Sequence, residues 1–268
     1  MIEARDTGSP GTAPNGGRDI RPGKDGKPGS KKPAPKLLFG AAAALVVVVV
    51  AVVAVVAVVV LTGGGEEKAP VVAKLAPTAY TPDYNGGGFA KIADRQADQR
   101  AITEAEAFGG DAKTIKSGQY TFTQAAAELT DCKAAAWGDR LQQDLAAHGC
   151  TQIGRAAYVS ADKKFVGQFI VINMKDKAGA DQIMRTLDPG ANAGWIVPLN
   201  PEGVPAFGEG FSAAYARNYG HYAVLTWVQQ AGGGQGATLN DLIDVSLAVE
   251  KPADFLWARL GLADGAAQ

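Results

Sequence analysis

The sequence has few of the side chains that most often carry enzyme chemistry or contact nucleic acids. It has 2 cysteines and 2 histidines in 268 residues, and 26 basic against 27 acidic side chains give a net charge of −1. Binding to a phosphate backbone needs a basic surface, which a near-neutral chain with a sequence pI of about 6.1 does not offer. We therefore expect no nucleic-acid partner.

Motifs that hold cofactors, metals or nucleophiles are also missing. The glycine-rich stretch AGGGQGAT at 231–238 has no P-loop lysine and does not match G-x-G-x-x-G between a strand and a helix. Cys132, His148 and Cys150 are too few and wrongly spaced for a structural zinc site. Ser212 in GFSAA matches part of a nucleophile elbow but enters a predicted strand, not a strand-to-helix turn. We predict no catalytic residue, no cofactor and no metal, and so not an enzyme.

One long apolar run stands out against this composition. Residues 37–61 read LLFGAAAALVVVVVAVVAVVAVVVL, without a charged or polar side chain. As a helix the run is about 37 Å long, and the hydrocarbon core of a bilayer is about 30 Å thick. The run is longer than the h-region of a signal peptide, and no A-x-A cleavage site follows it. We expect one transmembrane helix, with the lipid bilayer as its partner.

The charges beside this run predict its orientation. Residues 17–36 carry seven Lys or Arg, whereas residues 62–81 carry two. By the positive-inside rule the N-terminus is cytoplasmic and the C-terminal part extracytoplasmic. Residues 1–36 hold 8 basic and 4 acidic groups, and the remainder holds 18 and 23. The near-neutral chain thus divides into a basic inner tail and an acidic outer part of a cell-membrane protein.

Composition also divides the chain into four parts. Residues 1–36 are rich in Gly, Pro and charge and poor in apolar side chains, which predicts a disordered cytoplasmic tail. The transmembrane helix follows at 37–61. Triple glycines bracket a Pro-containing stretch at 62–88, which predicts a flexible stalk. Periodic apolar patterns begin near residue 89, so 89–268 is the expected extracytoplasmic domain.

The patterns in this domain predict alternating helices and strands. The best-defined strand, 165–174, is apolar on both faces, which is typical of a central strand. In chain order, we expect a polar helix at 89–108, a strand at 118–123, a helix from Thr130 or Asp131 to His148–Gly149, strands at 151–159 and 165–174, a helix after Asp176, strands at 211–217 and 222–230, a helix from Thr238 and a short helix after Pro252. This order predicts an α+β fold with a mostly antiparallel sheet and helices on one face. Its first six elements match a ferredoxin-like split βαβ, with an extra strand and C-terminal helices added.

The two cysteines are the sharpest chemical feature. Outside the membrane an even count favours a disulfide between Cys132 and Cys150. A continuous helix over 133–148 would be about 24 Å long and would hold the two cysteines apart, whereas a disulfide needs Cα atoms roughly 4.4–6.8 Å apart. The bond therefore requires a helix that starts late, for example after Gly138. Two separate buried thiols and an intermolecular bond remain as alternatives.

A long Pro/Gly connection at 188–210 holds the candidate interface residues. Loops of this length inside a compact domain are often functional. Trp195, Ile196, Val197 and Phe207 are costly to expose and suit an interface anchor. The alternative is that they pack against the edge of their own domain.

Short motifs in the domain resemble a known group of proteins. Asp131-Cys132, Gly149-Cys150 and Arg155-Ala156-x-Tyr158, behind one Val/Ala-rich span, resemble actinobacterial single-pass membrane-anchored extracytoplasmic proteins of unknown function. The resemblance covers residues 110–230 and implies no catalytic residues.

Anchor, stalk and missing catalytic set together predict a binding or scaffolding domain of the cell envelope. Its partner would be an envelope protein or a small ligand. The first alternative is an envelope hydrolase with an unrecognised site. The second is a small-molecule carrier, which would need an enclosed apolar cavity.

Overall fold

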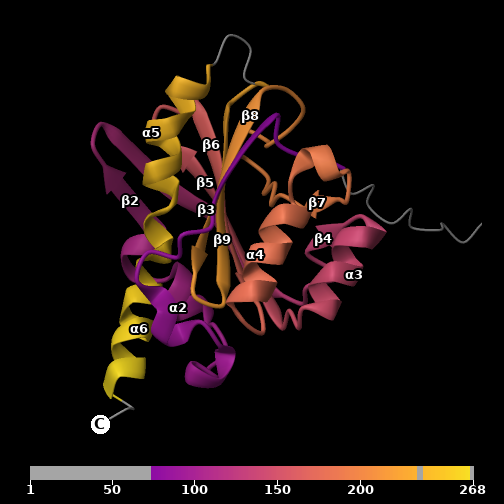
Figure 1. Ribbon diagram of the computed structural model, residues 1–268. Helices are drawn as coiled ribbons and strands as arrows, with labels where there is room; N and C mark the ends of the chain where they lie inside the picture. The colour runs from indigo at the N-terminus through magenta and orange to yellow at the C-terminus, as the bar shows by residue number, and fades with distance from the viewer. Residues whose placement is uncertain (1–73, 234–237, 266–268) are drawn as a thin grey trace, which may run out of the picture. The chain divides into compact units, whose positions relative to one another are not determined.

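The computed structural model describes residues 74–233 and 238–265 (Figure 1). They belong to one compact unit, 69–268. The predicted cytoplasmic tail, the predicted transmembrane helix at 37–61 and residues 62–73 of the predicted stalk lie outside the described residues. None of the helices in the described part is long and apolar enough to cross a bilayer.

A seven-stranded sheet forms the centre of the described part, in the order β1-β8-β9-β6-β5-β3-β2. Neighbouring strands are antiparallel except for β1 and β8, which are parallel. This confirms the α+β class and the mostly antiparallel sheet. The strands are β1 (Ala79–Asp83), β2 (Thr114–Ser117), β3 (Tyr120–Thr130), β5 (Gln152–Ser160), β6 (Phe165–Asn173), β8 (Ser212–Tyr219) and β9 (Tyr222–Gln230).

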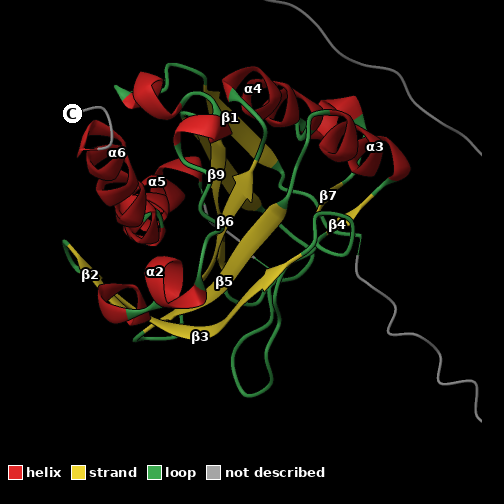
Figure 2. Ribbon diagram, turned by 90° about the horizontal axis from the view of Figure 1, so that it is seen from below, coloured by secondary structure: helices red, strands yellow, loops and turns green. Residues whose placement is uncertain are grey.

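Helices cover both faces of the sheet, so the prediction of helices on one face was wrong (Figures 1 and 2). The reason is the apolar character of β6 on both faces. Its Ile170 belongs to the core cluster that includes α3 and α4, and its neighbour Phe169 belongs to the cluster that includes α5. A sheet that is apolar on both faces must be covered on both. The helices are α2 (Glu104–Phe108), α3 (Asp139–Ala147), α4 (Lys177–Thr186), α5 (Leu239–Val249) and α6 (Phe255–Gly265).

The strand order matches the predicted split βαβ in one half only. Strands β6 and β8 are both antiparallel to β9, which lies between them, and α4 connects them. This β6–α4–β8 unit is a split βαβ. Strands β3 and β5, joined through α3, are instead direct antiparallel neighbours. A ferredoxin-like sheet would separate them, so that part of the prediction was wrong.

Helix α3 starts late and ends where predicted. It begins at Asp139, directly after Gly138, whose φ is 95°. A Cβ at Gly138 would lie 2.3 Å from the carbonyl oxygen of Ala193, so this close approach requires glycine. Before it, β4 (Ala136–Trp137) pairs with β7 (Trp195–Ile196) in a small second sheet. The helix ends at a His148 cap, followed by Gly149 with φ 66°.

Strand β1 lies in the segment for which the sequence predicts a flexible stalk. The hydroxyl of Tyr80 donates to the carbonyl oxygen of Met184 at 2.7 Å, and its ring packs edge-on against Trp195 with centroids 5.6 Å apart. Pro82 fits here because β1 is an edge strand, where a residue without an N–H is tolerated. The composition of residues 62–88 predicted a flexible stalk, but Ala79–Asp83 of this segment belong to the sheet.

The predicted polar helix at 89–108 is broken into short turns. Two 3-10 turns, at Phe89–Ile92 and Arg95–Ala97, precede α2. Asp94 accepts a hydrogen bond from the N–H of Gln96, and Thr103 caps α2 by accepting from the N–H of Glu106. Side chains that bond to nearby backbone groups in this way start new turns within a run of good helix formers.

Candidate functional site

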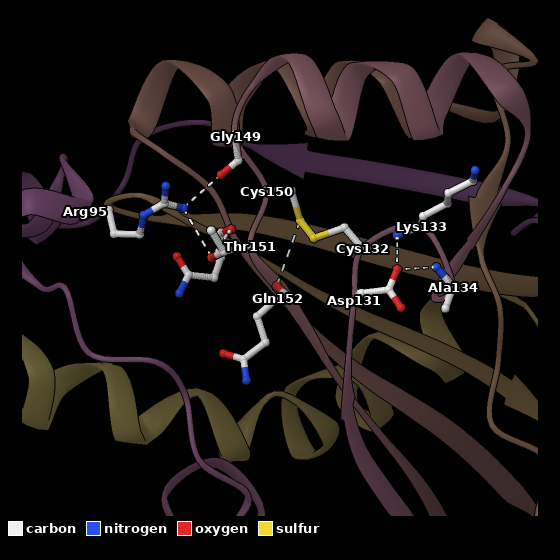
Figure 3. Close-up of a disulfide and its surroundings, with 10 residues drawn as sticks. Arg95, Asp131, Cys132, Lys133, Ala134, Gly149, Cys150, Thr151 and Gln152 are labelled. Carbon is white, nitrogen blue, oxygen red and sulfur yellow. Dashed lines mark hydrogen bonds between the residues drawn. A yellow bond between two sulfur atoms is a disulfide. The ribbon is translucent and has the colours of Figure 1, made fainter.

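A disulfide joins Cys132 to Cys150, with the Cα atoms 6.3 Å apart (Figure 3). The bond connects the segment that follows β3 to the segment that precedes β5, and so encloses α3. This confirms the predicted intramolecular bond and excludes two separate thiols or an intermolecular bond in this structure. The late start of α3 makes it geometrically feasible, as the sequence argument required.

The chain turns sharply beside this bond. Oδ1 of Asp131 accepts hydrogen bonds from the backbone N–H groups of Lys133 and Ala134, both at 3.0 Å (Figure 3). The N–H of Cys150 donates to the carbonyl oxygen of Leu145 at 2.9 Å and so follows the helix end. These local bonds bring the two cysteines together and leave Asp131 exposed at the end of β3.

The candidate interface residues of the 188–210 connection are core residues. Trp195, Ile196 and Phe207 are buried in the cluster between the sheet and α3 and α4. The rings of Trp195 and Phe207 pack against Trp227, with centroids 5.6 and 4.4 Å away. Val197 is half-buried, and its carbonyl oxygen accepts from Arg155. The connection packs on its own domain, so the three buried side chains are not available as interface anchors.

A polar pocket of about 480 Å³ lies beside the disulfide. It opens between the 95–101 segment, the end of β3 and the adjoining ends of β5 and β6. A second pocket of about 360 Å³ shares Arg95 and Gln99 and adds Asp94, Gln96 and Lys175. The polar side chains that line the first pocket are those of Arg95, Gln99, Thr130, Asp131, Thr151, Gln152 and Asn173.

Hydrogen bonds hold the walls of this pocket together. Nη1 of Arg95 donates to the carbonyl oxygen of Gly149 at 2.8 Å and to Oγ1 of Thr151 at 3.2 Å (Figure 3). The side-chain amide of Gln152 both accepts from the N–H and donates to the carbonyl oxygen of Ile102, at 2.9 Å each. The 95–102 segment is therefore fastened to the start of β5 across the pocket.

Most of this pocket has no signal in the sequence. Arg95 fell inside a predicted helix, and Asp131 was interpreted as a candidate helix cap. The Asp131-Cys132 and Gly149-Cys150 pairs did mark the two segments that meet at the pocket. Arg95 reaches them over 54 residues to Gly149, which no local pattern reveals.

A buried charged cluster supports the pocket segment from behind. The guanidinium of Arg259 in α6 is 0% exposed and bonds to Asp98 at 3.0 Å and to Glu106 at 2.6 Å. It also donates to the carbonyl oxygens of Arg100 and Ala101, at 2.8 and 2.9 Å. The C-terminal helix thereby fixes the stretch that begins at the pocket wall.

His221 is buried beside the same cluster. Its Nδ1 lies 2.7 Å from the carbonyl oxygen of Ile92, so Nδ1 carries the proton that is donated. Nε2 has no hydrogen-bond partner among the described residues. Burial lowers the pKa of His221 below its ordinary value. The hydrogen bond to Ile92 and the charge of Asp98 oppose this shift, and the charges of Arg95 and Arg259 add to it. The imidazole is therefore neutral at pH 7.

This burial predicts a pH-dependent stability. The pKa of His221 is higher in the unfolded chain than in the folded chain, so below about pH 6.5 the unfolded chain binds more protons. The stability of the fold therefore decreases as the pH is lowered through this range. We expect the free energy of unfolding, measured by urea denaturation, to decrease as the pH is lowered from about 7.5 to about 5.5. This one proton contributes a slope of at most about 1.4 kcal/mol per pH unit. His221→Gln should flatten this slope. An unchanged slope in His221→Gln would contradict the assignment.

The other residues considered for chemistry do not form a site in the described part. Ser212 lies inside β8, where its Oγ accepts from Nε1 of Trp227 at 3.0 Å, so it is not at a strand-to-helix elbow. Over residues 74–233 and 238–265, no group of three or more His, Cys, Asp or Glu side chains is arranged to hold a metal ion. The strongest candidate for function is therefore the polar pocket beside the disulfide.

The resemblance to membrane-anchored actinobacterial proteins rests on short motifs and stays a prediction. Comparisons of this chain with protein-family models, with curated proteins and with solved structures found no match.

Proposed function

We propose that this chain is a single-pass protein of the cell membrane that presents its α+β domain outside the cytoplasm as a binding domain. The observation that carries this proposal is the Cys132–Cys150 disulfide. Disulfides persist in oxidising compartments and are rare in the cytosol. The disulfide follows the apolar run at 37–61, whose flanking charges predict the same orientation.

The polar pocket supports binding as the role of the domain. A volume of about 480 Å³ falls in the range of about 300–1,000 Å³ typical of small-ligand sites. Asp131 is the one carboxylate among the residues that line it, and no serine, cysteine or histidine lines it with Asp131. The pocket therefore lacks the nucleophile–base and paired-carboxylate arrangements that hydrolases commonly use. A small-ligand binding site is therefore the function that this geometry supports best.

The disulfide serves as the reporter in a test of membrane topology. Cells that produce the full-length chain are treated with N-ethylmaleimide before lysis, and the mass of the intact protein counts the alkylated thiols. We expect no adduct on the full-length chain and a membrane fraction that withstands carbonate extraction. A matched variant without residues 37–61 should stay in the cytosol and carry two adducts, because cytosolic thiols are kept reduced.

Two results would overturn the proposed topology. One is two adducts on the membrane-bound full-length chain, which would place the domain in a reducing compartment. The other is release of the full-length chain by carbonate, which would show that residues 37–61 do not span the bilayer.

A further inference from the structure

Opposite charges stand at the two ends of the pocket beside the disulfide. Arg95 and Asp131 both line it, and they lie on opposite sides of Thr151 and Gln152 (Figure 3). Arg95 comes from the 3-10 turn Arg95–Ala97, and Asp131 directly follows β3. The hydrogen bonds of Arg95 to Gly149 and Thr151 fix the guanidinium against the pocket wall.

Both charged groups keep bonding capacity. Neither Arg95 nor Asp131 makes an ion pair within the described residues. Arg95 uses Nη1 alone, which leaves Nε and Nη2 as donors. Asp131 uses Oδ1 for the N–H groups of Lys133 and Ala134, which leaves Oδ2 as an acceptor. One end of the pocket can therefore receive an anionic group and the other end a cationic group.

Neutral polar groups lie between these ends. Asn173 lines the pocket and is 2% exposed, yet its Oδ1 has no hydrogen-bond partner in the described part of the chain. An unpaired buried polar atom costs free energy, and such atoms are often explained by a bound group. Thr151 lines the same pocket, and its Oγ1 accepts from Arg95 and donates to the carbonyl oxygen of Asn173. The part of a ligand that lies between the two charged ends would therefore face neutral polar side chains.

We propose that this pocket binds a small zwitterion, with its carboxylate at Arg95 and its ammonium group at Asp131, of the class of a free amino acid or dipeptide. A simple anion would face the carboxylate of Asp131, and a simple cation would face Arg95. A ligand with both charges satisfies both ends without net charge. This assignment rests on the proposed function, because it names the ligand class of the same binding site.

The test compares one dipeptide with two matched blocked forms. The full-length chain in detergent is titrated with glycylglycine, with N-acetylglycylglycine and with glycylglycinamide in a calorimeter. The acetyl group removes the ammonium charge, and the amide removes the carboxylate charge. We expect each blocked form to bind at least about tenfold more weakly, as for the loss of a charge-assisted hydrogen bond.

Variants assign each end of the ligand to its residue. Arg95→Gln should bind glycylglycine and glycylglycinamide equally, because the carboxylate has lost its partner. Asp131→Asn should bind glycylglycine and N-acetylglycylglycine equally, and its amide oxygen can still accept the two backbone bonds of the turn. Arg140→Gln is the matched control, because Arg140 lies on α3 outside the pocket lining and donates to Ala191. It should keep the selectivity of the parent.

The outcomes separate this ligand class from the proposed function. Equal affinity for all three peptides would overturn the zwitterion and leave a small-ligand site. If none of the three peptides gives a binding heat, the ligand class is overturned. The thiol-trapping result decides the membrane topology independently. Selectivity that survives both Arg95→Gln and Asp131→Asn would place the ligand elsewhere and overturn the assignment to this pocket.

Discussion

Replacement of Arg259 by methionine is expected to lower the free energy of unfolding by about 3–5 kcal/mol, the cost of breaking a buried ion pair on one side. The guanidinium is 0% exposed, and its partner Asp98 is 3% exposed. Methionine restores much of the volume but none of the hydrogen bonds. The loss therefore falls on Asp98, whose remaining ion pair would be the one with the exposed Arg100, at 3.4 Å.

The surroundings of Arg259 explain why its charge survives burial. Burial by itself disfavours the charged guanidinium, yet the hydrogen bond to Glu106 and the nearby Tyr222 and Asp98 keep its pKa above the ordinary value. The hydroxyl of Tyr222 lies 2.8 Å from Nη1 of Arg259 and 2.7 Å from Asp98. Arg259 is the only fully buried cation that bonds to Asp98, Tyr222 and Glu106 in the described part of the chain, so its removal affects all three.

A surface arginine provides the control for this prediction. Arg217 pairs with Asp83 at 3.5 Å and with Glu250 at 3.0 Å, but its side chain is 46% exposed. Arg217→Met should change stability by less than about 1 kcal/mol, because solvent screens exposed ion pairs. Unfolding in guanidinium chloride, followed by tryptophan fluorescence, measures the stability of both variants. Adding Asp98→Asn to Arg259→Met should recover part of the loss, and equal losses in Arg259→Met and Arg217→Met would contradict the buried-charge account.

Removal of the disulfide has the second-largest expected effect. The double variant Cys132→Ala/Cys150→Ala should lose about 3 kcal/mol, which the loop-entropy relation gives for a loop of this size. The cysteines are 18 residues apart, and the bond encloses α3. Without it the unfolded chain gains freedom, and the turn at Asp131 depends on local hydrogen bonds alone.

Unfolding with and without reductant checks this effect. The parent should lose stability in dithiothreitol, whereas the unfolding midpoint of the double alanine variant should not change. A parent whose midpoint does not move on full reduction, verified by mass, would show that the bond adds no stability.

Local patterns predicted the elements whose burial is periodic. Asp176 predicted the start of a helix, and α4 begins directly after it, with Ala180, Ile183 and Met184 buried on one face. The run at 165–174 predicted a central strand, and β6 lies between β5 and β9. The end of α3 followed from His148 and Gly149 because capping is a local interaction.

Long-range pairing explains what the sequence could not reveal. Strand β1 is a strand because it pairs with β8, which lies more than a hundred residues later. Its composition resembles a linker, and tertiary contacts override that local signal. The same holds for the pocket, where Arg95 meets Gly149, and for the buried Arg259, whose position in a short C-terminal helix gives no hint of its partners. The sheet class was therefore predictable, whereas the strand order and the site were not.

The link from Arg259 back to Asp98 also sets an order of events during synthesis. The two residues are 161 positions apart, so the ribosome makes most of residues 98–259 before Asp98 and Glu106 can bond to Arg259. The cysteines are 18 residues apart and are both available much earlier. A chain that leaves the ribosome from its N-terminus can therefore complete its disulfide first, and the pocket wall that adjoins Asp98 gains its support only when α6 has been made.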